Sequence, residues 1–70
     1  MTTICQMTNE KYGIKFELRK IDEEYVIYAS IGKRTKYYPV GKNAKTAYAE
    51  FEEDFHRCVA SQRYRQEWWF

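Results

Sequence analysis

The spacing of the apolar residues changes once along this chain, near Gly41, and that change constrains the fold more than any other feature. Before it, apolar side chains occupy every second position, at Tyr12, Ile14, Phe16 and Leu18. This alternation is typical of a β-strand with one buried face. After Gly41 the apolar side chains recur at steps of three and four residues, which is the period of a helix that packs on one face. The sequence therefore predicts strands followed by a helix.

Three strands are predicted between residues 12 and 40. The first begins at Tyr12 and ends at a polar turn at Asp22-Glu23, and the second covers residues 25–31. A two-residue loop at Gly32-Lys33 leads into the third, because glycine supplies the positive φ that such a turn needs. Pro39 in the third strand lacks an amide hydrogen, so this strand is expected at an edge of the sheet.

The register of the three strands follows from the two-residue loops, because a slip of one residue would turn every side chain to the other face. Leu18 then lies opposite Ile27, Ile27 opposite Tyr38, and Tyr25 opposite Val40, all on one apolar face. We call the opposite, more polar face the outer face. It is expected to carry Lys15, Glu17, Arg19, Val26, Tyr28, Ser30, Thr35 and Tyr37, with Tyr28 directly across from Tyr37.

The ends of the chain complete the predicted architecture. Residues 1–11 also alternate, and a four-residue turn after Met7 would place Cys5 opposite Ile14 as part of a fourth strand. A single helix is expected over residues 43–66, with Asn43 as its N-cap. Residues 67–70 form an aromatic tail. The fold class is therefore α+β: a three-stranded antiparallel β-meander, four-stranded if residues 1–11 join it, packed against one C-terminal α-helix.

The 70 residues are expected to form a single small domain, since this length is below that of most domains. No apolar run reaches the roughly 20 residues of a membrane span, and the first residues do not resemble a signal peptide. These features predict a cytosolic protein, within the host cell if a phage encodes it. Cys5 and Cys58 have no metal-binding or redox spacing and are expected to be buried free thiols.

Catalysis is not expected, because no arrangement of residues typical of an enzyme is present. The three glycines are too scattered for a phosphate-binding loop. The one histidine, His56, has Glu52 and Glu53 one turn before it, but all three are expected on the solvated face of the helix, where acids near the N-terminus are explained by the helix dipole. We therefore predict no catalytic site, no metal site and no cofactor.

Basic residues are concentrated in one part of the chain. Residues 25–49 hold five basic and no acidic residues, whereas the other 45 residues hold seven basic and ten acidic residues. Clustered positive charge attracts phosphate backbones, and exposed tyrosines stack on bases. Lysine on an edge strand also discourages aggregation, and cross-strand tyrosine pairs also stabilise hairpins, so a purely structural role is an equal alternative. The residues predicted to contact nucleic acid are Lys15, Arg19, Tyr28, Lys33, Arg34, Lys36 and Tyr37.

The run YVIYASIGKRTKYYPVGKNAKTAYAEFEEDF resembles the three-stranded DNA-binding domains at the N-terminus of many tyrosine-recombinase integrases, which share their fold with Apetala-type plant domains. The resemblance covers about half the chain: Gly32-Lys33-Arg34 corresponds to a basic turn between two strands, Asn43 to a helix cap, and Ala47 to the alanine that begins the buried helix face. It implies that the sheet enters the DNA major groove. Glu17, in the middle of the outer face, departs from the pattern.

The predicted function is therefore that of a small, non-enzymatic DNA-binding protein of the kind that phages and mobile elements encode. The alternative is an inhibitor that docks on a host enzyme which itself handles nucleic acid. A third interpretation is an assembly subunit. The tail, Trp68, Trp69 and Phe70, is expected either to close the core or to anchor a protein partner or a second copy of the chain.

Overall fold

The computed structural model of the protein describes residues 2–67 and contains one antiparallel sheet and two helices. The strands are β1 (Thr2–Asn9), β2 (Ile14–Ile21), β3 (Glu24–Ile31) and β4 (Arg34–Pro39). The helices are α1 (Ala44–Ala60) and α2 (Gln62–Glu67). The strands lie in the order β1-β2-β3-β4, so that each strand pairs with its neighbour in the sequence. The predicted α+β class is confirmed, and residues 2–9 supply the fourth strand.

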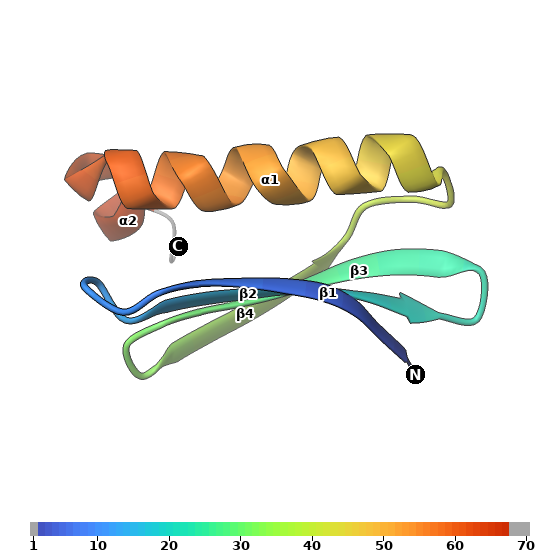
Figure 1. Ribbon diagram of the computed structural model, residues 1–70, viewed down its shortest axis with the longest axis horizontal. Helices are drawn as coiled ribbons and strands as arrows, with labels where there is room; N and C mark the ends of the chain where they lie inside the picture. Colours follow the sequence, from blue (N-terminus) through green and yellow to red (C-terminus); the bar gives the residue numbers. More distant parts are fainter. Residues whose placement is uncertain (1, 68–70) are drawn as a thin grey trace.

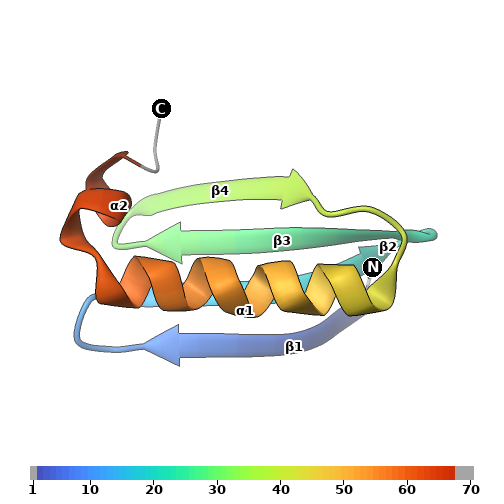
Figure 2. The same cartoon turned by 90° about the horizontal axis from the view of Figure 1, so that it is seen from above.

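The elements form two layers, with α1 lying along one face of the sheet (Figure 1). Seen from above, α1 runs over β2 and roughly parallel to the strands, while β4 lies to one side of it (Figure 2). Within residues 2–67, no helix or strand covers the other face of the sheet. The outer face is therefore open with respect to residues 2–67, although Val26 on this face is only 8% exposed.

The predicted register of the last three strands is confirmed. Leu18 pairs with Ile27, Ile27 with Tyr38, and Tyr28 with Tyr37. Both loops have two residues, and their first positions, Asp22 and Gly32, have φ values of 57° and 62°. β4 is an edge strand, as Pro39 predicted.

The predicted register of β1 is wrong, because the observed partners on β2 lie four residues further along that strand. Cys5 pairs with Leu18 rather than with Ile14, because β1 continues to Asn9 and the turn occupies Glu10–Gly13. Tyr12, expected as a core residue of the first strand, lies in this turn and is 37% exposed. The side chain of Asn9 accepts a hydrogen bond from the backbone amide of Tyr12 (3.2 Å), which favours the later turn. Cys5 nevertheless packs against the core, as expected.

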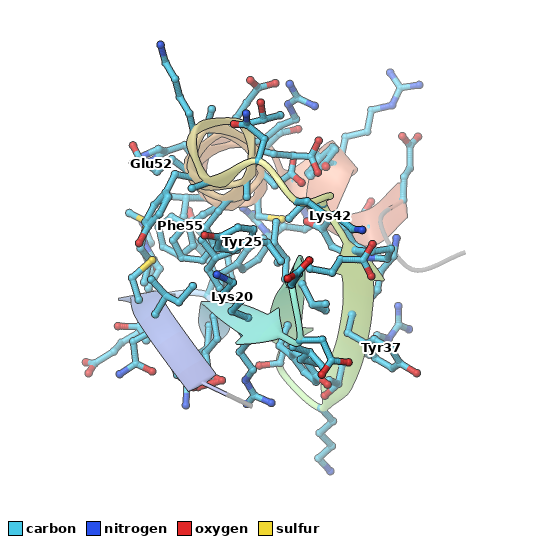
Figure 3. The ribbon with its side chains drawn as sticks, turned by 90° about the vertical axis from the view of Figure 1, so that its right-hand side faces the viewer. Lys20, Tyr25, Tyr37, Lys42, Glu52 and Phe55 are labelled. Atoms are coloured by element: carbon cyan, nitrogen blue, oxygen red, sulfur yellow. The ribbon has the colours of Figure 1, made fainter. Side chains whose placement is uncertain are left out.

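The core lies between the sheet and α1. Phe16 and Ile27 on the sheet are fully buried, and Phe51 and Phe55 on the helix are 2% and 5% exposed. The ring of Phe16 packs edge-on against that of Phe55, with centroids 5.6 Å apart. Figure 3 shows Phe55 in this layer and Tyr37 on the other side of the sheet, beside β4. Alternation within the strands thus separates an apolar face from a polar one.

The single helix expected over residues 43–66 is interrupted at Ser61, which has an extended backbone (φ −128°, ψ 114°). The hydroxyl of Ser61 accepts a hydrogen bond from the amide of Tyr64 (3.1 Å) and so caps α2. The guanidinium of Arg65 donates to the carbonyls of Cys58 and Val59, at 2.6 and 3.1 Å, where α1 ends. Side-chain caps on both sides of Ser61 therefore replace the continuous helical ladder. The cap at the other end of α1 is as predicted, since Asn43 accepts from the amide of Thr46 (3.0 Å).

Neither helix in the described part of the chain has the length and apolar character needed to cross a membrane.

Candidate nucleic-acid interface

The residues predicted to contact nucleic acid do not all lie on one face of the sheet. Four of them, Lys15, Arg19, Tyr28 and Tyr37, project from the outer face. Arg34 and Lys36 lie on the helix-bearing face, because they pair with Ile31 and Ala29 there, while Lys33 is exposed at the β3–β4 turn. The aromatic tail, Trp68, Trp69 and Phe70, falls outside the described residues, so its predicted role stays a prediction.

A stack of three side chains crosses the outer face from β2 to β4. The guanidinium carbon of Arg19 lies 3.9 Å from the centroid of the Tyr28 ring. On the other side of Tyr28, the ring of Tyr37 lies nearly parallel to it, at 17°, with centroids 5.4 Å apart. Because β3 lies between β2 and β4, the two faces of the Tyr28 ring are covered by Arg19 and Tyr37. Tyr37 ends the stack and is 67% exposed.

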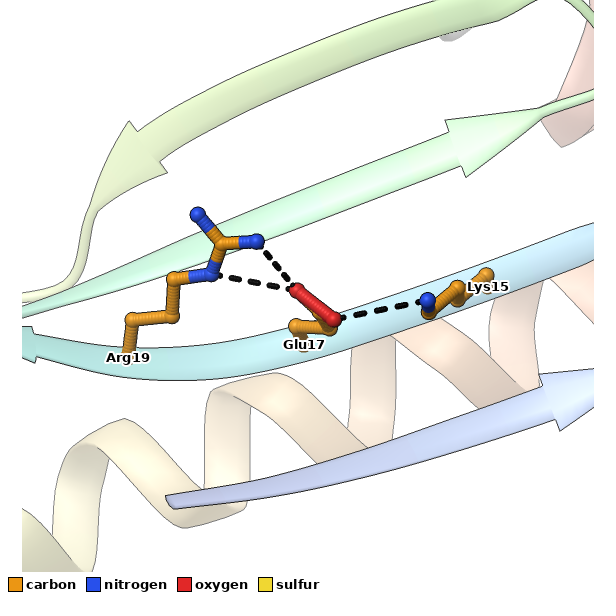
Figure 4. Close-up of polar contacts among 3 residues, drawn as sticks. All are labelled: Lys15, Glu17 and Arg19. Carbon is orange, nitrogen blue, oxygen red and sulfur yellow. Dashed lines mark hydrogen bonds and ion pairs between the residues drawn. The ribbon is translucent and has the colours of Figure 1, made fainter. Parts of the chain in front are cut away.

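Glu17 holds two of the basic residues of the outer face (Figure 4). One carboxylate oxygen accepts hydrogen bonds from Arg19 Nε (3.1 Å) and Nη2 (2.5 Å), and the other lies 3.5 Å from Lys15 Nζ. The hydrogen bonds from Arg19, with the positive charges of Arg19 and Lys15, lower the pKa of Glu17 below its ordinary value. The carboxylate is therefore ionised at neutral pH. Glu17 neutralises part of the positive charge of this face and holds Arg19 against Tyr28.

A shallow hollow of about 200 Å³ lies next to the stack on the outer face. Lys15 lines it together with the hydroxyl-bearing side chains of Ser30 and Thr35. The side chain of Lys15 is 53% exposed, so its ammonium group is accessible from solvent. An ammonium beside two hydroxyls matches the hydrogen-bonding needs of a phosphate. Glu17, Arg19, Tyr28 and Ala29 complete the lining.

The helix-bearing side of β4 has different contacts. The ammonium of Lys36 lies 5.7 Å from the centroid of the Tyr38 ring, and the Tyr38 hydroxyl donates a 2.6 Å hydrogen bond to Asp54 of α1. Arg34 borders a separate open hollow between the hairpin turns and α2, where Arg65 lies 3.9 Å over the ring of Tyr12. β4 thus presents basic side chains on its helix-bearing side and Tyr37 on its outer side.

The two hairpin turns at this end of the sheet are joined through their backbones. The amide of Gly32 donates a 3.0 Å hydrogen bond to the carbonyl of Gly13. Gly13 has a φ of 66°, and a Cβ at this position would lie 3.7 Å from the Gly32 nitrogen. The left-handed backbone therefore favours glycine there, whereas a Cβ would make only an ordinary van der Waals contact with the other turn. This bond holds Lys33 at a defined place relative to β2.

Nothing within residues 2–67 assembles a metal site, as no group of three or more His, Cys, Asp or Glu side chains is placed to hold an ion. Both cysteines are free thiols, with Cys58 buried on α1 and Cys5 partly buried on β1. Burial raises the pKa of Cys58 to about 11 and raises that of Cys5 above its ordinary value. Both thiols are therefore protonated at neutral pH, which is typical of structural cysteines.

Sequence reasoning identified Glu17 as a departure from the integrase pattern but missed what it does. The predicted register of β2 and β3 already indicated this role. Glu17 pairs directly with Tyr28, and Arg19, two residues further along β2, lies on the same face. A carboxylate two positions from an arginine on one face of a strand can accept from it, and the arginine can then reach a ring on the next strand.

Residues 2–67 thus define a class of protein, a small α+β domain in which a helix covers one face of the sheet and no described element covers the other, which carries an aromatic stack. Comparison with protein-family models, with curated proteins and with solved structures found no match to this chain.

Proposed function

We propose that this protein is a non-enzymatic DNA-binding protein that contacts DNA through the outer face and outer edge of its sheet. The observation that carries the proposal is the stack that ends in Tyr37. A tyrosine that is 67% exposed, on an open sheet and in line with a second tyrosine and an arginine, is suited to contact bases or sugars. The resemblance to integrase DNA-binding domains favours the same surface.

The charges around the stack support the same proposal. Lys15 beside the hollow and Lys33 at the turn are exposed, and each can neutralise a phosphate. Because Arg19 already donates to Glu17, we assign it the role of supporting Tyr28 rather than of reading a base edge. With few cations on this surface, affinity is expected to be moderate and the salt dependence shallow, since counterion release grows with the number of phosphate contacts.

The experiment is a fluorescence polarisation titration with labelled DNA, duplex and single-stranded, at about 50 and 200 mM salt. The double variant Lys15→Ala/Lys33→Ala should bind more weakly. The slope of log affinity against log salt should fall by up to about 1.8 on duplex and about 1.4 on single-stranded DNA, because each lost phosphate contact contributes about 0.9 or 0.7. The matched control is Lys42→Ala/Lys45→Ala, which removes the same charge from the segment before α1 and from the first turn of α1, at the other end of the sheet, and should keep its slope. Absence of binding to both forms of DNA at the lower salt, or equal losses in the two variants, would remove the proposal.

A second candidate is an inhibitor of an enzyme that handles nucleic acid, and the acidic surface of α1 favours it. Glu50, Glu52 and Glu53 are exposed there, on the helix that covers the other side of the sheet. The nucleic-acid-binding surfaces of such enzymes are basic, so an acidic helix complements them electrostatically. Under this alternative, Glu50→Gln/Glu52→Gln would relieve inhibition of a nuclease by the protein, and Lys15→Ala/Lys33→Ala would not.

A further inference from the structure

The Tyr37 ring has one face in the stack and the other face toward solvent. Tyr28 lies against its inner face, and Arg19 closes the far end of the stack on β2. The exposure of Tyr37 therefore belongs to its second face and its rim. Since β4 is the edge strand, a group stacked on this second face would continue the line of rings beyond the edge of the sheet.

We infer that an unpaired nucleobase stacks on this outward face of Tyr37, and that the protein selects single-stranded DNA over duplex DNA; the inference rests on the proposed function. In a duplex each base is covered on both faces by its neighbours and offers only its edges in the grooves. A tyrosine that offers the face of its ring therefore has no partner within an intact duplex. In a single strand the base faces are accessible, and stacking on an aromatic ring is the dominant contact.

The positions of the basic side chains fit a strand that follows the β4 edge. A duplex lying against the outer face would contact Lys15 and Lys33. It would not contact Arg34 or Lys36, which lie on the helix-bearing face. Because β4 is an edge strand, however, the side chains on both of its faces lie beside the same edge of the sheet, and a strand of DNA along that edge is close to both sets. A base that continues the stack past Tyr37 would bring its flanking phosphates beside β4, which carries two basic residues and no acidic residue.

The hollow lined by an ammonium and two hydroxyls, which match a phosphate, lies on the outer face next to the same stack. Lys15, Ser30 and Thr35 line it, and Thr35 lies two residues before Tyr37 on the same face of β4. A single strand can bend at each nucleotide, so one phosphate can enter this hollow while the neighbouring base stacks on Tyr37. The carboxylate of Glu17 in the lining is offset by Arg19 and Lys15.

The test compares a labelled oligothymidylate of about 20 nucleotides with a duplex of the same length by fluorescence polarisation at about 50 mM salt. The variants are Tyr37→Leu, which removes the aromatic face, and Tyr37→Phe, which keeps it. Tyr48→Leu is the matched control, because Tyr48 is an exposed tyrosine on α1. Thermal unfolding of each variant verifies that the domain stays folded.

The wild-type protein should bind the oligothymidylate more tightly than the duplex. Tyr37→Leu should lose about 5- to 150-fold in affinity for the single strand, the range for loss of one base stack, with less than a twofold change for the duplex. Tyr37→Phe and Tyr48→Leu should bind like the wild type. Equal or tighter binding of the duplex, or equal losses on both forms in Tyr37→Leu, would overturn the inference and leave the proposed function standing. Absence of binding to both forms would overturn both.

Discussion

The two faces of the sheet are built from alternate residues of the same strands, yet they are held in different ways. On the helix-bearing face, Phe16 and Ile27 are fully buried and belong to one apolar core cluster. On the outer face, Arg19, Tyr28 and Tyr37 contact one another through a guanidinium-ring and a ring-ring stack and remain partly in water. Burial of apolar surface dominates folding free energy, whereas partly exposed polar contacts contribute little.

The difference teaches which residues are available for function in so small a domain. A chain of 70 residues has one marginal core, and nearly every apolar side chain of the helix-bearing face is needed for it. Apart from Val26, which is 8% exposed, the outer face is expected to contribute little to stability, so its other residues can change with little effect on the fold. Substitutions on the two faces should therefore separate stability from binding.

The largest effect is expected in the core. Phe16→Ala should lower the free energy of unfolding by about 3–5 kcal/mol, because it leaves a cavity where Phe51 and Phe55 meet the sheet. Urea unfolding followed by circular dichroism measures this change, and in so small a domain the variant is expected to be largely unfolded. A loss below about 1 kcal/mol would mean that the helix-bearing face is not the stabilising one.

An intermediate effect is expected where the edge strand meets the helix. Tyr38→Phe removes the 2.6 Å hydrogen bond to Asp54 and should cost about 1–3 kcal/mol, because the acceptor is charged and the pair is partly buried. Burial and, to a smaller degree, the bond to Asp54 raise the pKa of Tyr38 above its ordinary value, so the hydroxyl remains a donor at neutral and mildly alkaline pH. A double-mutant cycle with Asp54→Ala, which removes the acceptor, measures the coupling. A coupling of zero would show that β4 is held by the sheet alone.

A smaller effect is expected at the centre of the outer face. Glu17→Gln should cost about 0.5–1 kcal/mol at pH 7, since partly exposed ion pairs contribute little. The pKa of Glu17 is lower in the folded protein, so its contribution is present above pH 4.5 and is lost as the pH falls through the folded value. The stability difference between wild type and variant, measured by urea unfolding from pH 7 to pH 3, should therefore shrink on acidification. A difference that grows instead would contradict the assigned role.

The smallest effect on stability is expected at the end of the stack. Tyr37→Thr should change the free energy of unfolding by less than about 0.5 kcal/mol, because the side chain is mostly exposed and threonine is well suited to a strand. Its effect on DNA affinity should nevertheless exceed that of Glu17→Gln. Urea unfolding measures the stability and fluorescence polarisation measures the DNA affinity of the same sample. A loss of stability without a loss of binding would show that the outer face does not separate the two properties.

Much of this architecture could be predicted because short-range rules determine it. Two-residue loops at Asp22-Glu23 and Gly32-Lys33 set the parity of β2, β3 and β4, and parity alone assigns each side chain to a face. The predicted register of β1 is wrong because its loop has four residues, and a loop of that length can start at more than one position. The choice depends on the side chain of Asn9 and on the bond between Gly13 and Gly32, and the latter is a tertiary contact.

The candidate site was predictable in part for the same reason. Parity placed Tyr28 opposite Tyr37 and put Lys15 and Arg19 on the outer face, as the structure has them. Parity also places Lys36 on the helix-bearing face, but the predicted nucleic-acid surface combined it with residues of the outer face. The apolar period stops at Val59. The break at Ser61 itself depends on two side-chain contacts that this spacing does not show: the Ser61 hydroxyl caps α2, and Arg65 donates to the carbonyls at the end of α1.

The meander order of the strands has a consequence for how the chain is made. Each strand pairs with the one synthesised just before it, so the sheet can form by hairpin closures of about 1–10 μs as the chain grows. The 17 residues of α1 follow, and at about 5–20 residues per second they take on the order of a second or more to appear. During that interval the apolar face of the nascent sheet has no cover, and it is then most prone to associate with other nascent chains. Translation speed across α1, rather than equilibrium stability, should therefore determine how much of this protein reaches its folded state at high expression.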